Sequence, residues 1–312
     1  MGMTQLSPLE RPVPPAPVPP RRRRGRRRPS VNAILFTLPA LVLMAVFLVY
    51  PVVQNFRYSL TNWNGITAPS YVGLANFREL ISDPLFRDVI KHTLQLAVFG
   101  TAAAVAVGVL WAYGIDRRLP GWRTYRFLLF VPVVIPITVS GLLWSLLLGP
   151  QGPTNVIAQD LGWKNPPVWL GDPHVTLWVV IAVSVWQAAG FTMLLILGAM
   201  EDIPREQHEA ASLDGAGSLR RLVSIVLPNI RGTVAIVTVL QFISLLKAFD
   251  LVFAMTQGGP GNATDVLGTY LYQESFAELR WGYGSAVAVT MTVLLFLLSF
   301  GLYRSLLHKE TS

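Results

Sequence analysis

The sequence predicts an all-α membrane protein with six transmembrane helices and both termini in the cytoplasm. Three observations carry this prediction: 52% of the 312 residues are hydrophobic and only 13% are charged, long apolar windows recur, and the basic residues are distributed unevenly between them. An apolar window of about 20 residues is the length that a helix needs to cross a bilayer. The chain therefore belongs in a membrane.

Six windows of that length occur, at residues 31–53, 94–115, 127–149, 175–199, 232–256 and 282–303. Five of them contain no Asp, Glu, Lys or Arg, and the fifth window holds Lys247 and Asp250. The windows are apolar on all sides, whereas a transmembrane strand would alternate in polarity. Helices are therefore expected in all six windows. Pro132 and Pro136 should kink the helix of the third window, residues 127–149.

The basic residues set the orientation, because Lys and Arg near the spans are retained on the cytoplasmic side. With the N-terminus inside, 18 of the 25 basic residues lie in cytoplasmic segments, six lie outside, and Lys247 lies within a span. Without the arginine-rich N-terminal stretch the balance is still ten to six. The segment at 200–230 is then cytoplasmic.

Two terminal segments fall outside the spans. Residues 1–30 contain PVPPAPVPP and RRRRGRRR, and they are expected to be a disordered cytoplasmic tail. We interpret the arginines as a contact with anionic lipid, with nucleic acid as the alternative. The first window is too long for a signal peptide and is expected to be retained. Residues 308–312 are expected to be a second cytoplasmic tail.

The sequence contains no pattern of catalytic, metal-binding or nucleotide-binding residues. Cysteine is absent, the four histidines lack ligand spacing, and no lysine stands in a phosphate-binding glycine loop. We therefore expect no enzyme activity, no metal site and no cofactor on this chain.

The cytoplasmic segment 200–230 is expected to form a helix, a tight turn and a second helix. Pro204 suits a first helical turn, Asp214 and Gly215 suit its end, and Ser218 is a candidate N-cap for a helix ending before Pro228. Small residues at 210–211 and the acidic pair Glu206 and Glu209 would leave a surface able to enter a groove on another protein. The alternative is a solvated connector between two spans.

This segment carries a specific pattern: EAA at 209–211, then three residues, Gly215, nine residues, Ile225, one residue, and Leu-Pro at 227–228. The pattern resembles the signature of the membrane subunits of binding-protein-dependent ABC importers. The stretches WLGDP (169–173), SVWQAAGFTMLLILGAMEDIP (184–204), LDGAG (213–217) and FDLVFAMTQGGPGNATDVLGTYLY (249–272) look like the sugar-uptake branch of maltose and lactose permeases. The resemblance covers roughly residues 30–307 and implies the type I importer permease fold.

The resemblance also implies partners: a second homologous permease subunit, two copies of a cytosolic ABC ATPase that holds ATP and Mg²⁺, and an extracytoplasmic solute-binding protein. It implies a bacterial cell membrane as the location. It further implies that the segment 200–230 is the coupling helix that sits in a cleft of the ATPase. The coupling residues would be Glu206, Glu209, Ala210, Ala211, Asp214, Gly215, Ile225, Leu227 and Pro228.

A substrate path is expected beside the charged fifth window, because charge inside a membrane needs a partner or a cavity. Its candidate residues are Trp186, Gln187, Gln241, Ser244, Lys247 and Asp250. Lys247 and Asp250 stand at i and i+3, so a structural ion pair is the alternative.

Three other functions are alternatives to sugar import. A glycerol phosphate permease would require more than one basic residue in its spans to bind phosphate. A stand-alone secondary transporter would require more intramembrane carboxylates for ion coupling. A membrane enzyme has no catalytic residues to support it. The sequence does not identify the sugar.

Overall fold

The computed structural model describes residues 31–307, apart from the side chains of residues 31–34, 205, 208, 210, 212 and 307. The expectations for residues 1–30 and 308–312 lie outside the described residues. The chain divides into two units, residues 1–51 and 52–312, and each is described by itself.

The first unit contains α1 (Val31–Met44), the π-helical turn η1 (Ala45–Val49) and the start of α2 (Tyr50–Tyr58). This helical stretch provides one candidate membrane span, Leu35–Tyr58. Every described side chain from Leu35 to Pro51 is exposed, and the stretch is apolar on all sides. Such a surface suits contact with lipid tails.

The second unit is helical apart from a two-residue antiparallel ladder in which Thr61 lies opposite Tyr71. Its strands are β1 (Thr61–Asn62) and β2 (Ser70–Tyr71). Its helices are α3 (Ala75–Ser82), α4 (Pro84–Asp116), α5 (Trp122–Val134), α6 (Ile137–Leu147), α7 (Pro153–Asp160), α8 (Thr176–Glu201), α9 (Arg205–Leu213), α10 (Ser218–Arg221), η2 (Leu222–Val226), α11 (Leu227–Asn229), α12 (Arg231–Leu246), α13 (Asp250–Thr256), α14 (Leu267–Tyr272), η3 (Gln273–Ala277) and α15 (Trp281–Leu307).

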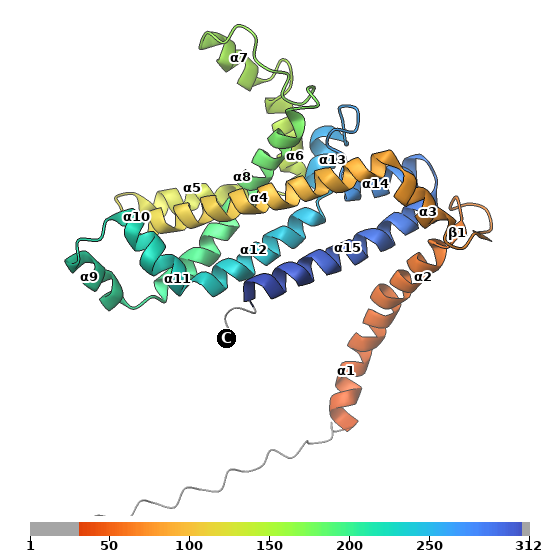
Figure 1. Ribbon diagram of the computed structural model, residues 1–312, viewed down its shortest axis with the longest axis horizontal. Coiled ribbons are helices and arrows are strands. Elements are labelled where there is room, and N and C mark those ends of the chain that lie inside the picture. The colour runs from red at the N-terminus through yellow and green to blue at the C-terminus, as the bar shows by residue number, and fades with distance from the viewer. Residues whose placement is uncertain (1–30, 308–312) are drawn as a thin grey trace, which may run out of the picture. The chain divides into compact units, whose positions relative to one another are not determined.

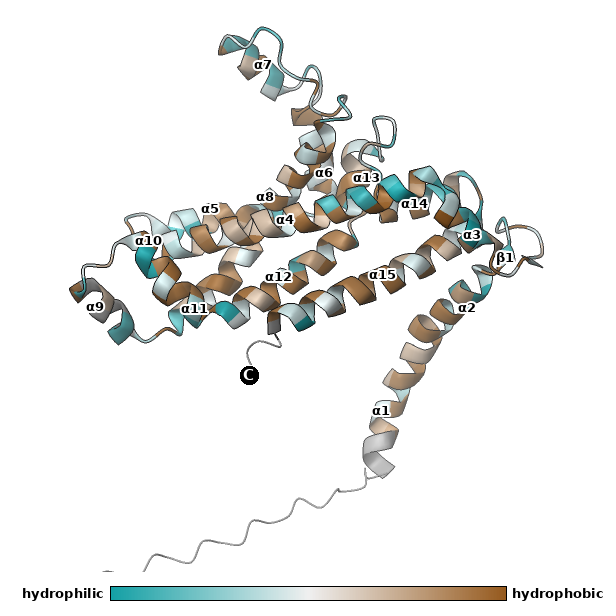
Figure 2. Ribbon diagram, in the orientation of Figure 1, coloured by the Kyte–Doolittle hydropathy of each residue, from teal (hydrophilic) through white to brown (hydrophobic). Residues whose placement is uncertain are grey.

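Within residues 31–307, four helices are long and apolar enough to cross a membrane, and six spans result if each of two bent pairs counts as one. The bent pairs are α5 with α6, at 99°, and the segment Ser218–Asn229 with α12, at 79°. Figure 2 shows hydrophobic residues along much of α12 and α15 and hydrophilic residues at α3 and α9. The all-α membrane fold expected from the sequence is confirmed.

The predicted third and fifth spans differ from simple helices. The third consists of α5 and α6, so the expected kink is present, and Pro136 is the N-cap of α6. The fifth, predicted as continuous over 232–256, is interrupted: α12 ends at Leu246 and α13 begins at Asp250. Lys247 and Asp250 therefore do not share the i, i+3 face of one helix.

Close helix packing holds α4, α8 and α5 together. A Cβ on Gly108 of α4 would lie 2.4 Å from Thr192 Cγ2 on α8, and one on Gly190 would lie 2.4 Å from the Leu129 carbonyl oxygen of α5. Small residues at such crossings let backbones approach, which drives helix association in a membrane. In Figure 1, α9 and α14 lie near opposite ends of α4, so this packed core separates the expected cytoplasmic and extracytoplasmic ends.

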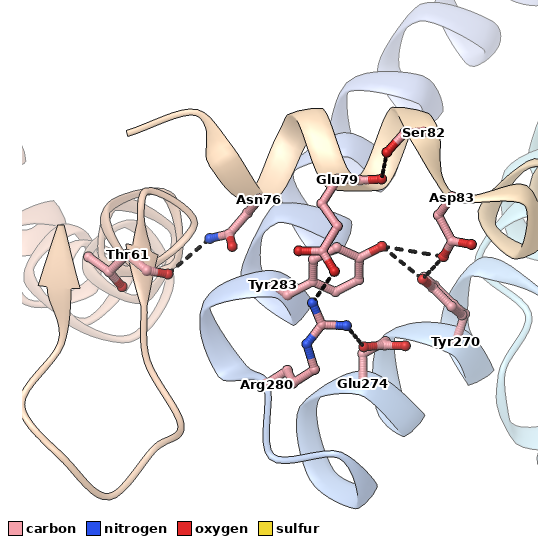
Figure 3. A network of polar contacts seen from close by, with 9 residues as sticks. All are labelled: Thr61, Asn76, Glu79, Ser82, Asp83, Tyr270, Glu274, Arg280 and Tyr283. Atoms are coloured by element: carbon pink, nitrogen blue, oxygen red, sulfur yellow. Dashed lines mark hydrogen bonds and ion pairs between the residues drawn. The ribbon is translucent and has the colours of Figure 1, made fainter. Parts of the chain in front are cut away.

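A polar network ties the extracytoplasmic elements to one another (Figure 3). Asp83, between α3 and α4, accepts a hydrogen bond from the Tyr270 hydroxyl at 2.7 Å, and that hydroxyl lies 2.9 Å from the Tyr283 hydroxyl. Arg280 bridges Glu274 at 3.0 Å and also pairs with Glu79. The network therefore joins α3, α14, η3 and α15.

The same region contains a buried carboxyl group. Asp265 is fully buried, its Oδ1 accepts a hydrogen bond from the Thr269 hydroxyl at 2.7 Å, and its Oδ2 has no partner among the described residues. Burial raises the pKa of Asp265, although the Thr269 hydrogen bond and the charge of His92 act in the opposite direction. The folded state therefore favours the protonated carboxyl.

We expect Asp265→Asn to stabilise the protein at neutral pH. A raised folded-state pKa means that the contribution of Asp265 to stability is present at low pH and is lost as the pH rises through that pKa. The neutral amide avoids this loss, which is worth about 1.4 kcal/mol per unit of pKa shift. The difference in apparent melting temperature of the purified protein between about pH 3.5, below the usual carboxyl pKa, and about pH 8 should be smaller for the variant than for the wild type.

Asp88→Asn is the matched control, because Asp88 is exposed on α4. That substitution should leave the pH dependence of the melting temperature as in the wild type. An Asp265→Asn protein that melts lower than the wild type at both pH values would show that the ionised carboxylate is the stabilising form.

Candidate functional site

A cavity of about 450 Å³ lies where helices α6, α8, α12 and α13 meet. Its volume lies within the range of small-molecule sites in proteins. Both helix interruptions of the transmembrane core border it. Its lining residues are Ile137, Ser184, Gln187, Ala188, Gln241, Ser244, Leu245, Lys247, Ala248, Phe249, Asp250 and Leu251.

The first interruption, between α5 and α6, is stabilised by a side chain from α8. The Gln187 amide donates to the Pro132 carbonyl at 2.8 Å and to the Ile135 carbonyl at 2.9 Å. Backbone carbonyls freed by a break need such partners inside a membrane. Gln187 thus borders the cavity while its amide nitrogen is used to hold the α5–α6 bend.

The second interruption places two charged residues at the cavity. Lys247 caps the end of α12, Asp250 begins α13, and both side chains are exposed to the cavity. Among the described residues, no ion pair or hydrogen bond joins Lys247 to Asp250. The expectation that they form a structural ion pair is therefore not met, and both groups stand at the cavity wall.

The remaining predicted path residues differ in their positions. Ser244 is exposed and lines the cavity. Gln241 also lines it, although its side chain is largely buried and donates to the Thr192 hydroxyl on α8 at 3.0 Å. Trp186 is not among the lining residues; its ring packs edge-on against Trp144, with centroids 5.4 Å apart. Its stacking role in the path stays a prediction.

The predicted coupling segment has the expected helix, turn and helix. Helix α9 ends at Leu213, and Gly215 adopts a φ of +67°, a left-handed conformation that glycine tolerates. The Ala216 amide then donates to the Ala211 carbonyl at 3.0 Å and closes the turn. The second helix begins at Ser218, with Gly217 and not Ser218 at the N-cap position.

The second helix continues farther than predicted. Through η2 and α11 it passes Pro228, which the sequence led us to expect beyond its end. Pro228 lies two residues beyond the end of the π-helical turn η2, and α11 ends one residue later at Asn229. Leu222, Val226 and Ile230 along this stretch are buried against α4 and α8.

One hydrogen bond fixes the coupling segment to α4, and a second joins the two ends of the segment. The Tyr113 hydroxyl on α4 donates to the Ser218 carbonyl at 2.8 Å, and the Asn229 amide donates to the Gln207 side-chain oxygen at 2.9 Å. The buried residues of η2 pack in the same cluster as α4 and α8, and the Gln207–Asn229 bond joins α9 to the end of this helical stretch.

The individual coupling residues take different positions. Glu206, Glu209, Asp214, Gly215 and Pro228 are exposed, and Ile225 and Leu227 are half-buried. Ala211 is buried within this chain, which differs from its expected contact with another protein. Ala210 belongs to α9, but its side chain lies outside the described ones.

Sequence reasoning missed two exposed apolar residues of the same segment. Leu213 at the end of α9 is 89% exposed, and Leu219 in α10 is 73% exposed. The sequence could have indicated their exposure, because these leucines stand among polar residues in a cytoplasmic loop.

Residues 104–311 match the family described as the inner membrane component of binding-protein-dependent transport systems. A probable ABC transporter permease protein of Pyrococcus horikoshii is 33% identical over 86% of this chain and 94% of its own length. The diacetylchitobiose uptake system permease protein of Streptomyces coelicolor is 31% identical over 85% of this chain and 80% of its own.

Among solved structures, the fold is similar to that of a chain in a bacterial alginate ABC transporter, crystallised with an alginate pentasaccharide-bound periplasmic protein. The TM-score is 0.75 with 22% identity, covering 86% of this chain and 91% of that one. The similarity confirms the importer permease fold expected from the sequence.

Proposed function

Because this chain belongs to the family of inner membrane components of binding-protein-dependent transport systems, we propose that it forms one half of the path by which a sugar is imported. The observation that carries the proposal is the cavity at the two helix interruptions. Discontinuous helices in transporters commonly form the substrate site, since their unpaired backbone groups and side chains face a cavity.

The chemistry of the cavity wall suits a neutral polyol. Gln241, Ser244, Lys247 and Asp250 supply both hydrogen-bond donors and acceptors, and Phe249 supplies an aromatic ring. Sugar hydroxyls both donate and accept, and the apolar face of a sugar ring packs on aromatic rings. Lys247 is the one basic residue among the described lining residues, which favours a neutral solute over a phosphate ester.

The names of similar proteins support carbohydrate as the cargo class. One relative is named for the uptake of diacetylchitobiose, and the similar solved structure belongs to an alginate transporter. These glycans differ in charge and length, so the specific sugar of this chain is not assigned by similarity.

We propose that ATP drives transport through a partner. In this scheme, a cytosolic ATPase that holds ATP and Mg²⁺ grips α9, a second permease subunit completes the cavity, and an extracytoplasmic binding protein delivers the sugar. The contacts that follow α9 support this role, because Ser218 is bonded to α4, η2 packs with α4 and α8, and Asn229 is bonded to Gln207 of α9. Binding of ATP then shifts the population between inward-facing and outward-facing states.

Purification of the tagged chain from native membranes, followed by reconstitution with ATP inside the vesicles, tests the proposal. The probes are radiolabelled maltotriose, lactose, diacetylchitobiose and glycerol 3-phosphate, each supplied outside with the co-purified binding protein. ATP-dependent accumulation of a sugar is the expected result. Accumulation of glycerol 3-phosphate alone would change the cargo class, and uptake by the isolated chain without ATP would indicate a secondary transporter.

A further inference from the structure

Seven aromatic rings form a continuous series of contacts in the second unit, and we name this series the aromatic row. Its members are Phe249, Phe253, Tyr272, Phe276, Trp281, Trp63 and Tyr58. Adjacent ring centroids lie between 4.2 and 6.1 Å apart. Four separate parts of the chain contribute to it, so the series is a product of the fold and not of a local repeat.

One end of the aromatic row opens on the proposed substrate cavity. Phe249 lines that cavity, and its ring centroid lies 5.5 Å from that of Tyr272. Tyr272 in turn stacks on Phe276 at 5.1 Å. The row therefore begins at the cavity wall and leaves it along α14 and η3.

The other end lies among the extracytoplasmic elements. The Phe276 ring meets Trp281 at 4.8 Å, and Trp281 meets Trp63, in the segment between β1 and β2, at 6.1 Å. That segment precedes α3 and lies outside the membrane in the orientation derived above. The row thus connects the side from which a binding protein delivers its cargo with the cavity.

The middle of the row is accessible in this chain. Tyr272 is 37% exposed and Phe276 is 52% exposed. Exposed polar residues flank them, Gln273 and Glu278 among them. A lipid-facing surface would exclude a carboxylate and an amide, whereas a sugar site combines aromatic faces with such groups.

The row is also held in place by its surroundings. Gly65, at a φ of +82°, leaves room for Trp281, because a Cβ there would lie 2.7 Å from the indole Nε1. Arg280 fixes η3 through its bond to Glu274 (Figure 3). Binding to a surface that is already ordered costs less conformational entropy than binding to a mobile one.

We propose that the aromatic row is an entry track, on which the rings of an incoming sugar stack as they pass from the binding protein to the cavity. This inference rests on the proposed function and extends it, since it assigns the step before the cavity. Aromatic stacking tolerates sliding, because each ring offers a similar flat face to the next unit of a saccharide chain. The track therefore favours oligosaccharides over single sugars.

Cysteine labelling tests whether the row faces water and cargo. The chain has no cysteine of its own, so Phe276→Cys introduces a single thiol. In intact cells, a charged, membrane-impermeant maleimide should modify that thiol from outside. Ile66→Cys, at an 81% exposed position before β2, is the positive control, and Phe300→Cys, on the apolar α15, is the control that should stay unmodified.

The second arm of the test adds the probe sugar. Maltotriose, or whichever panel sugar the wild type accumulates, should slow modification of Phe276→Cys at least about threefold in the presence of the binding protein, since occupancy shields the thiol. Modification of Ile66→Cys should not change. A Phe276→Cys thiol that resists the reagent while Ile66→Cys reacts would overturn the track, because lipid or the second permease then covers the row.

Uptake rates supply an independent readout. Phe276→Ala and Tyr272→Ala should each lower uptake of the trisaccharide by about two- to tenfold, the range expected for the loss of one aromatic contact, while Tyr272→Phe should restore it. Phe300→Ala, which alters a ring stacked on Phe296 outside the row, should transport normally. Normal uptake by both alanine variants would refute the track and leave the proposed function intact. Failure of the wild type to import any panel sugar would instead remove the proposed function.

Discussion

Replacing Leu213 by aspartate is expected to separate the chain from its ATPase while leaving the chain itself folded. Leu213 is 89% exposed, so the substitution removes almost no packing within this chain. In the proposed complex the side chain enters a groove of the ATPase, where an unpaired carboxylate costs several kcal/mol. We therefore expect at least about a hundredfold weaker association, measured by ATPase co-purification with the tagged variant.

The matched control is Leu119→Asp. Leu119 is 52% exposed in the turn between α4 and α5, a second cytoplasmic segment with no proposed docking role. This variant should retain the ATPase and show the same melting temperature as the wild type. Equal retention of the ATPase by the Leu213 and Leu119 variants would contradict the placement of α9 in the interface.

Replacing Lys247 by methionine should strongly impair uptake without disturbing assembly. The ammonium stands at the cavity wall with no ion pair among the described residues, so its loss leaves no carboxylate unpaired within this part of the chain. A hydrogen bond from a charged group to a ligand contributes about 1.5–3 kcal/mol. Apparent affinity for the transported sugar should fall about 10- to 150-fold.

Asp250→Asn should have a smaller effect than Lys247→Met, because the amide can still accept and donate hydrogen bonds. For both variants, the KM and the maximal rate of ATP-driven uptake are measured. The subunits that co-purify with each variant report on assembly. Lys164→Met, at an exposed position beyond α7, is the control and should change neither quantity. Loss of the partner subunits from the Lys247 variant, with wild-type affinity in what remains, would assign Lys247 to assembly.

Much of the fold was predictable because the membrane limits the choices. Backbone groups must be satisfied within each span, so a long apolar window leaves helix as the solution. The turn at Gly215 was predictable for a local reason, since Asp-Gly after a helical run favours the left-handed conformation found there. The prolines at 132 and 136 likewise indicated the bend between α5 and α6.

The interruption at residues 247–249 could not be predicted in the same way. No proline or glycine marks it, and hydropathy averaged over a window hides a break of three residues. The interruption lies at a close tertiary contact: a Cβ on Gly268 of α14 would lie 2.8 Å from the Ala248 carbonyl oxygen. That contact joins residues 20 apart in the sequence and is invisible to local patterns.

The sequence could also not predict in which direction each side chain of α8 points. This helix is apolar on nearly every face, so no period distinguishes the cavity side from the side packed on its neighbours. Trp186 and Gln187 are therefore equally good path candidates by sequence, whereas in the structure the Trp186 ring lies against Trp144 and Gln187 borders the cavity. The aromatic row was missed for a similar reason, because its members come from distant segments.

The bend between α5 and α6 has a consequence for how the protein enters the membrane. Gln187 lies on α8, more than 50 residues after the Pro132 carbonyl that it satisfies, so α5 and α6 are synthesised before that partner exists. The Pro132 carbonyl also accepts from the Ile135 amide, but until α8 arrives the bend would leave the Ile135 carbonyl without its Gln187 partner in lipid, at a cost of several kcal/mol. We therefore expect the α5–α6 segment to remain in the insertion machinery, or unbent, until α8 has been made.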